Sequence, residues 1–225
     1  DQPQRAIARG QWAVFYDDFI VYDLAQGTTH YTLTQTNCAD SNSGTSGYPG
    51  TVALTNAGAD NDLGQLYGTS GTIIIPTTKK AIFECRFKVD KGAAGTIGEQ
   101  ELFIGLATVQ TAANFTAADG LTMAVDNAIG FWSPDGTANL AAIIRASDVE
   151  TIDSDATTYA DATYYVMSWY YDGNGTTKFF QDGAVISSQT ATLPTAVTTP
   201  MFYIKAGQAN ASVLTIDYVF LAVQR

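Results

Sequence analysis

Charged residues are scarce in this chain. They make up 15% of its 225 residues, and glutamate occurs at four positions only. Long helices and coiled coils are built largely from Ala, Glu, Lys, Leu and Arg. This chain has 30 Thr and 32 Ala against 6 Lys. We therefore expect no long helix and a surface finished mainly by uncharged polar residues.

Basic residues are also few. The chain has 11 Lys and Arg against 22 Asp and Glu, which leaves a net charge of −11. A nucleic-acid-binding protein needs a basic surface, and the same charge disfavours an anionic membrane. No apolar run approaches the roughly 20 residues that span a bilayer. We expect neither nucleic acid nor a membrane as partner. The first residues have no apolar signal-peptide core, which leaves the compartment open.

Cysteine and histidine are nearly absent. Cys38 and Cys85 are the two cysteines and His30 is the one histidine, so no metal-binding Cys/His pattern exists. We expect no metal and no cofactor. Alternation puts Cys85 on the apolar side of its segment, which predicts a free, buried thiol. A bond to Cys38 is the alternative in a secreted protein. His30 is predicted to lie at or near the surface.

Alternation of apolar and polar residues is the main pattern that is present. It recurs in about a dozen short segments separated by Gly, Asn, Asp, Pro and Ser, which is typical of an antiparallel sandwich. The predicted strands are 12–23, 30–34, 51–55, 71–76, 81–89, 101–109, 128–132, 140–146, 162–171, 177–181, 184–189, 200–206 and 212–223.

The remaining segments are predicted as loops. Residues 36–50 and 56–65 are rich in Ser, Gly, Asn and Asp and are predicted to lie on the surface. One short helical turn is expected within the alanine-rich stretch 108–118. No repeat of 20–50 residues is present, which disfavours propellers and solenoids.

The start of the chain differs from the rest. Residues 1–11 have little periodicity and carry Arg5 and Arg9. We predict that they form an N-terminal arm and that 12–225 form a single domain. The arm is either a frayed terminus or a segment that docks on a neighbouring acidic subunit.

Two Asp-Gly pairs separate three of the predicted strands. Asp172-Gly173 and Asp182-Gly183 lie between alternating segments, and Asp-Gly favours a tight primed turn because both residues accept positive φ. The three strands from residue 162 to residue 189 are therefore predicted to form a meander.

This meander resembles a recurrent part of the concanavalin A-like (laminin G-like) jelly roll. The matching residues are Tyr171, Asp172, Gly173, Lys178, Phe179, Asp182, Gly183 and Val185. Segments 103–107, 129–131 and 214–219 are similar to further strands of that fold. The resemblance covers about residues 66–225 and implies an all-β chain, an antiparallel β-sandwich of the concanavalin A-like jelly-roll class.

Among such domains, the chain looks most like structural proteins of tailed bacteriophages. It resembles them in motif order, in low charge and in Thr, Ala and Gly richness. The resemblance implies a virion structural protein, made in the host cytoplasm, that acts as a capsid decoration (cement) or head-surface protein. The major capsid protein, another virion protein and further copies of this chain are the implied partners. The alternative is a carbohydrate-binding, lectin-like module of a tail fibre or a secreted protein.

The sequence argues against catalysis. Glucanases of the same fold need an E-x-D-x-x-E strand, which is missing here. Glu99 and Glu101 are the nearest acidic pair, with about 6.6 Å between Cα atoms on a strand, and such carboxyls can suit glycoside hydrolysis. A third acid is lacking and a glycine-rich loop precedes Glu99. We interpret both residues as solvated charges at a strand end and expect a protein that is not an enzyme.

Two binding hypotheses stay open. Calcium prefers oxygen ligands, and Asp and Asn are also ordinary turn residues. The candidate ligand groups are Asp17-Asp18, Asp60-Asn61-Asp62 and Asp153-Ser154-Asp155. The aromatic residues that can stack on a sugar, or form core and oligomer contacts, are Trp12, Trp132, Trp169, Tyr170 and Tyr171. Alternation puts Trp169 and Tyr171 on one face and Tyr170 on the other.

Five of the eleven basic residues lie within positions 79–91. Such a cluster can meet an acidic partner, such as a neighbouring copy or a capsid lattice. The other interpretation is a solvated strand face whose charges block edge pairing. The predicted partner-binding residues are Arg5, Arg9, Lys79, Lys80, Arg86 and Lys88.

Overall fold

The computed structural model describes residues 11–19, 30–42, 50–69, 73–92, 95–109, 115–116 and 123–225. In these residues the backbone forms fifteen strands and no helix. It follows that no helix in this part of the chain is long and apolar enough to cross a membrane.

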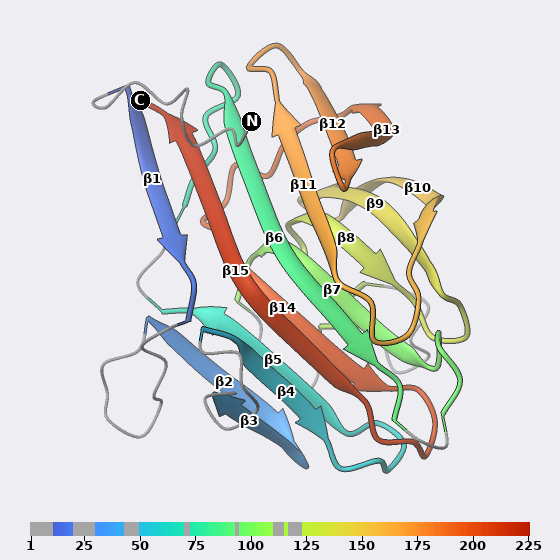
Figure 1. Ribbon diagram of the computed structural model, residues 1–225. Coiled ribbons are helices and arrows are strands. Elements are labelled where there is room, and N and C mark those ends of the chain that lie inside the picture. Colours follow the sequence, from blue (N-terminus) through green and yellow to red (C-terminus); the bar gives the residue numbers. More distant parts are fainter. Residues whose placement is uncertain are drawn as a thin grey trace.

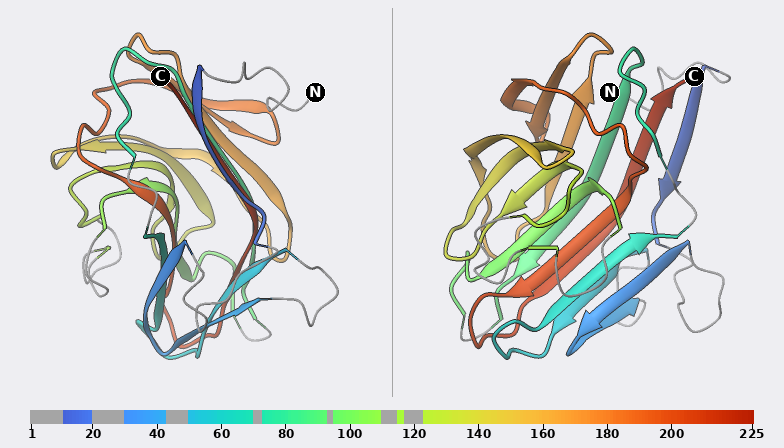
Figure 2. Two further views of the ribbon diagram at one scale, coloured as in Figure 1. Left: turned by 90° about the vertical axis from the view of Figure 1, so that its left-hand side faces the viewer. Right: turned by 180° about the vertical axis from the view of Figure 1, so that it is seen from behind.

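The strands form two antiparallel sheets that pack face to face (Figures 1 and 2). Sheet A contains, in spatial order, β13 (Ala184–Thr190), β12 (Thr176–Gln181), β11 (Tyr165–Tyr171), β6 (Ala81–Asp90), β15 (Val213–Gln224), β4 (Val52–Asn56) and β3 (Cys38–Asn42). Its further strand, β1 (Trp12–Asp17), pairs with the second half of β15, whereas β4 pairs with the first half. Sheet B contains, in spatial order, β10 (Val149–Thr158), β9 (Asn139–Ala146), β8 (Ala128–Ser133), β7 (Gln100–Ala107), β14 (Thr199–Ala206), β5 (Leu63–Gly68) and β2 (Tyr31–Thr36). The predicted all-β antiparallel sandwich is confirmed.

The main core lies between the sheets and is rich in aromatic rings. Within sheet A, Phe83 stacks on Trp169 with ring centroids 5.8 Å apart. Phe131 of sheet B meets Phe179 of sheet A edge to face at 5.6 Å. Aromatic contacts of this kind add to the free energy gained by burying apolar area. They join the two layers at the centre of the sandwich.

Both cysteines are free and buried, as predicted for Cys85. Burial raises the pKa of the Cys38 thiol to about 12 and raises that of Cys85 as well. The thiols therefore stay protonated at neutral pH and pack as small apolar groups.

The predicted meander is present as β11, β12 and β13. Asp182 and Gly183 at the second turn have φ angles of 49° and 83°, which are the positive values that a tight primed turn requires. The second Asp-Gly pair was therefore interpreted correctly. The first pair lies in a longer loop, 172–175, where Gly173 has positive φ and Asp172 does not.

Three strands were not predicted. β5 begins inside the predicted surface loop 56–65, lies between β14 and β2 in sheet B, and is mostly buried. The other two, β3 and β10, lie at sheet edges. β3 falls inside the predicted loop 36–50, and β10 has the polar sequence VETIDSDATT. The turn before β10 is made by Ser147 and Asp148, whose φ angles are 50° and 70°; without glycine it carried no turn signal. Edge strands need only backbone pairing with one neighbour, so they can form without an apolar alternation.

Other expectations were wrong or fall outside the described residues. In the segment predicted as strand 71–76, the described part makes one isolated bridge, between Ile73 and Thr198. In 108–118, the described residues are not helical, and Thr116 forms a bridge with Met123. Residues 1–10 of the predicted arm 1–11, and residues 20–23 of the predicted strand 12–23, lie outside the described residues.

Candidate functional site

The outer face of sheet A, which points away from sheet B, carries two of the predicted basic residues. In β6, buried and half-buried residues alternate strictly, so Arg86 and Lys88 lie on this outer face. Arg86 forms an ion pair with Asp217, and its guanidinium lies 4.1 Å from the centre of the Tyr164 ring. The Lys88 ammonium lies 5.3 Å from the same ring. Both cations therefore already make favourable contacts within the molecule.

Lys79 and Lys80 lie elsewhere. An extended chain rises about 3.4 Å per residue, which separates Lys80 from Arg86 by about 20 Å along β6. Lys79 donates from Nζ to the carbonyl oxygen of Arg225 at 2.9 Å. The backbone of Arg225 also donates to Gln11, at the start of β1, at 2.8 Å. Thus Lys79, Lys80 and Arg225 form a basic end of the sandwich, where the chain enters β1 (Figure 1).

The outer face of sheet B, which points away from sheet A, is closed by a second apolar cluster. Phe103 of β7 and Tyr203 of β14 lie beside each other on this face, and Phe115 covers both, with ring centroids 4.8 and 5.0 Å away. Met123 and Val125 complete the cover. All five side chains are buried. The aromatic rings on this face contact each other and are closed to a ligand.

A buried ion pair lies beside this cluster. Lys205 donates from Nζ to Oε1 of Glu101 at 2.7 Å. The Thr116 hydroxyl donates to the other carboxylate oxygen and lies 3.1 Å from the Tyr203 hydroxyl. Burial raises the pKa of Glu101, and the contacts to Lys205 and Thr116 oppose that rise. Burial and the neighbouring Glu101 also raise the pKa of Tyr203.

The interpretation of Glu101 as a solvated charge was therefore wrong. Glu101 is only 1% exposed to solvent. The available signal was alternation: Glu101 is two residues from Phe103 in β7, and Lys205 is two from Tyr203 in β14. Both sets of residues share one face of adjacent strands. Glu101 was interpreted as exposed because it is charged and lies at a strand end. In the structure it can be buried because Lys205, on the adjacent strand, neutralises its charge.

Glu99 has a structural role of its own. Its Oε2 accepts hydrogen bonds from the backbone of Thr96 at 2.8 Å and from Asn210 at 2.9 Å. Glycoside hydrolysis needs two carboxyls on either side of an accessible sugar. Here Glu99 holds a turn and Glu101 is enclosed, so the pair does not form such a site.

The three proposed calcium groups use their carboxylates in local hydrogen bonds. Asp62 accepts from Asn37 at 3.0 Å and from the backbone of Ala59 at 2.8 Å. Asp17 accepts from the backbone of Phe19, and Asp155 from Asn139. Among the residues that the structure describes, no three His, Cys, Asp or Glu side chains gather closely enough to hold a metal ion.

The aromatic residues divide between core and surface. Trp169 and Tyr171 share the buried face of β11 while Tyr170 is half-buried on the other side, as predicted. Trp132 is 4% exposed and belongs to the apolar cluster on sheet B. Trp12 is half-buried in β1. Most of the proposed stacking platform is therefore interior, and Trp12 and Tyr170 remain on the outer face of sheet A.

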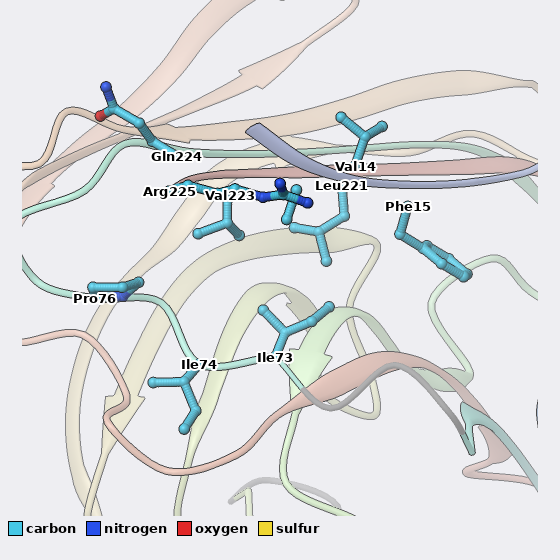
Figure 3. A pocket seen from close by; sticks show the side chains of 10 residues that line it. Val14, Phe15, Ile73, Ile74, Pro76, Leu221, Val223, Gln224 and Arg225 are labelled. Atoms are coloured by element: carbon cyan, nitrogen blue, oxygen red, sulfur yellow. The ribbon is translucent and has the colours of Figure 1, made fainter. Parts of the chain in front are cut away.

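An apolar strip lies along β1 at the edge of sheet A. Val14 and Tyr16 are 52% and 50% exposed, and Ile74 nearby is 53% exposed. Between β1 and residues 73–76 there is a groove of about 340 Å³. Phe15 points into it, whereas Val14 points to the opposite side of the strand (Figure 3). This edge is the candidate interaction surface.

The fold is shared with several solved proteins. No protein-family model matches the sequence, and no curated protein matches it. An endo-1,3-β-glucanase from Streptomyces sioyaensis has 11% identity and a TM-score of 0.64, covering 97% of this chain and 98% of its own. Peanut lectin with a bound nine-residue peptide has 12% identity and a TM-score of 0.65, covering 95% and 97%.

The carbohydrate recognition domain of Emp47p is similar as well, at 10% identity and a TM-score of 0.60, covering 95% of both chains. The chain therefore has the lectin-like, concanavalin A-like jelly-roll fold that the motif resemblance implied. Proteins with this fold include both lectins and glucanases, so the fold alone does not determine the function.

Proposed function

We propose that this chain is a non-enzymatic structural protein of a virion, a decoration or head-surface protein that contacts the capsid lattice and copies of itself. The observation that carries the proposal is the exposed apolar strip on β1, at a sheet edge that an assembly partner can cover. Internal bonds engage Glu99 and Glu101, the nearest candidates for a catalytic pair. The motif resemblance to tailed-bacteriophage proteins supplies the virion context.

The basic end supports an acidic partner. Lys79, Lys80 and Arg225 lie where the chain enters β1, and Arg5 and Arg9 precede that point in the sequence. The rest of the molecule is strongly acidic. A negatively charged partner surface attracts the basic end of such a protein and repels its acidic faces, so the protein binds in one orientation. Repetition over many lattice sites then makes modest single contacts strong in sum.

Cosedimentation with capsid shells that lack the protein tests this proposal. The wild-type chain is expected to bind saturably and stoichiometrically. A Lys79→Glu/Lys80→Glu variant, and a variant without residues 1–10, are expected to lose at least tenfold in affinity. Lys91→Glu is the matched control, because Lys91 follows the far end of β6, about 37 Å from Lys80 along the strand. Absence of wild-type binding, or equal loss in the control, contradicts the proposal.

Carbohydrate binding is the second candidate. It is favoured by the likeness of nearly the whole chain to peanut lectin and to a carbohydrate recognition domain. Trp12 and Tyr170 supply partly exposed rings on the outer face of sheet A. A glycan array with wild type and a Trp12→Ala/Tyr170→Ala variant decides between the two. Glycan binding that this variant loses, together with no binding to shells, replaces the virion role by a lectin role.

A further inference from the structure

The loop that joins β11 to β12 contains the single Asn-Gly pair of the sequence, Asn174-Gly175. Asn174 is exposed. Among the described residues, none makes a hydrogen bond to its side-chain amide. Gly175 has no side chain to separate its backbone nitrogen from that amide, and its φ angle of 99° lies in a region that glycine adopts freely. The two groups that react when an asparagine deamidates are therefore adjacent and accessible.

The backbone of this loop is held on both sides of the reactive nitrogen. Asp172 Oδ1 accepts from the backbone N–H of Asn174 at 2.6 Å and from that of Thr176 at 3.1 Å. The Gly175 N–H donates to the Tyr171 hydroxyl at 3.2 Å, which is at the long end of the range for such bonds. The loop is therefore folded, while its Gly175 nitrogen is weakly held.

The side-chain amides of two other asparagines are fixed in place. Asn56 donates from Nδ2 to the Ser212 hydroxyl at 2.8 Å, and Asn210 donates from Nδ2 to Glu99 at 2.9 Å. An alanine follows each of them in the sequence, and its Cβ hinders the approach of the backbone nitrogen to the amide. These two asparagines therefore provide an internal reference for the reactivity of Asn174.

We propose that Asn174 is a site of spontaneous deamidation. The Gly175 nitrogen attacks Cγ of Asn174, the new C–N bond closes a five-membered succinimide, and the Cγ–Nδ2 bond breaks. The leaving amino group takes up the proton that the Gly175 nitrogen loses and departs as ammonia. Water then opens the succinimide at either carbonyl, which leaves aspartate or isoaspartate at position 174. Water is the co-reactant, and the loop gains one negative charge.

The new charge arises beside the basic end. A Cβ on Gly173 would lie 3.3 Å from the carbonyl carbon of Lys79 and 3.4 Å from the backbone nitrogen of Lys80. The 172–175 loop therefore packs on the turn that carries both lysines, where β11 ends and β6 begins (Figure 1). Asn174 is the next residue, so a charge there lies within about 10 Å of that backbone, which is the Debye length at about 0.1 M salt. Deamidation thus lowers the positive potential of the basic end as the protein ages.

Peptide mapping by mass spectrometry tests the modification on the isolated protein. During incubation at mildly alkaline pH, Asn174 is expected to deamidate at least tenfold faster than Asn56 and Asn210. The rate is expected to rise with hydroxide concentration, because the Gly175 nitrogen must lose its proton. Asn174→Gln is the matched control, since it keeps an amide whose attack requires a less favourable six-membered ring. A rate at Asn174 that does not exceed the rate at Asn210, or equal deamidation in the control, overturns the inference.

The effect on the basic end rests on the proposed function and is measured separately. Asn174→Asp is expected to bind capsid shells at least threefold more weakly than wild type. Gln208→Glu adds the same charge in an exposed position before β15, at the opposite end of that twelve-residue strand from Arg225, and is expected to bind like wild type. Equal binding by Asn174→Asp and wild type overturns this effect. Absence of wild-type binding contradicts the proposed function, whereas deamidation in the isolated protein supports the modification site independently of it.

Discussion

Strands β6 and β7 lie at the middle of sheet A and sheet B, but their outer faces differ. In β6 the residues alternate between buried and half-buried, whereas every residue of β7 is buried. Sheet A packs on one side and meets solvent on the other. The centre of sheet B is covered on both sides, because Phe115, Met123 and Val125 close its outer face there, whereas the edge strands β10 and β2 are partly exposed. An outer-face residue therefore belongs to a surface in one sheet and to a core in the other.

The same difference separates the two ion pairs. Arg86 and Asp217 on sheet A have side chains that are 39% and 28% exposed, whereas those of Lys205 and Glu101 on sheet B are 7% and 2% exposed. Water screens the first pair and solvates its members when they separate. The second pair is shielded from water, so removal of either residue leaves the other as an uncompensated buried charge.

Truncating a ring on the outer face of each sheet is expected to give the largest contrast. Phe103→Ala on sheet B should lower the free energy of unfolding by about 4 kcal/mol, because it empties a closed cluster. Tyr16→Ala on sheet A should change it by about 0.5 kcal/mol in the monomer. Urea denaturation, done where the protein is monomeric, measures both. Equal losses would show that the two faces do not differ as described.

Breaking the buried ion pair is expected to have the next largest effect. Glu101→Gln should cost about 3 kcal/mol, because it leaves the Lys205 ammonium buried without a counter-ion. The double variant Glu101→Gln/Lys205→Met removes both charges and should return to within about 1 kcal/mol of wild type. The two residues are not coupled if the double variant's loss in free energy of unfolding equals the sum of the losses of Glu101→Gln and Lys205→Met.

The pH dependence of stability follows from the raised pKa of Glu101. The folded protein holds this proton to higher pH than the unfolded chain, so unfolding releases it between the two pKa values. The free energy of unfolding contributed by this group therefore falls as the pH rises above the ordinary carboxyl value and through the raised one. Urea midpoints of wild type are expected to fall relative to the double variant over that range. If the urea midpoints of wild type and the double variant change in parallel with pH, Glu101 is not the group responsible.

Removing the half-exposed ion pair is expected to have the smallest effect. Arg86→Met keeps part of the packing on Tyr164 and loses the contact to Asp217. Exposed and half-exposed pairs contribute about 0.2–1 kcal/mol. The loss should shrink further in high salt, which screens such pairs. A loss as large as that of Glu101→Gln would mean that the outer face of sheet A is also shielded from water.

The parts of the fold that could be predicted share one property. β6 and the meander of β11, β12 and β13 have an apolar alternation or an Asp-Gly turn in their own residues, and each was predicted. β3, β5 and β10 have neither and were not predicted. β3 and β10 are polar edge strands that pair with one neighbour, whereas β5, with the sequence LGQLYG, is held between β14 and β2. The position of Arg86 on the outer face followed from alternation, whereas its contacts to Tyr164 and Asp217 depend on residues far along the chain.

The sequence by itself determined the class of this protein. Its scarcity of charge, its two-residue period and its Asp-Gly turns were enough for an antiparallel sandwich, because these signals act between residues close in the chain. Only the tertiary structure decided that Glu101 is enclosed with Lys205 and that, among the described strands, β1 pairs with β15 alone. Burial and edge position depend on which distant segments come to lie alongside a strand, and a strand's own residues do not contain that information.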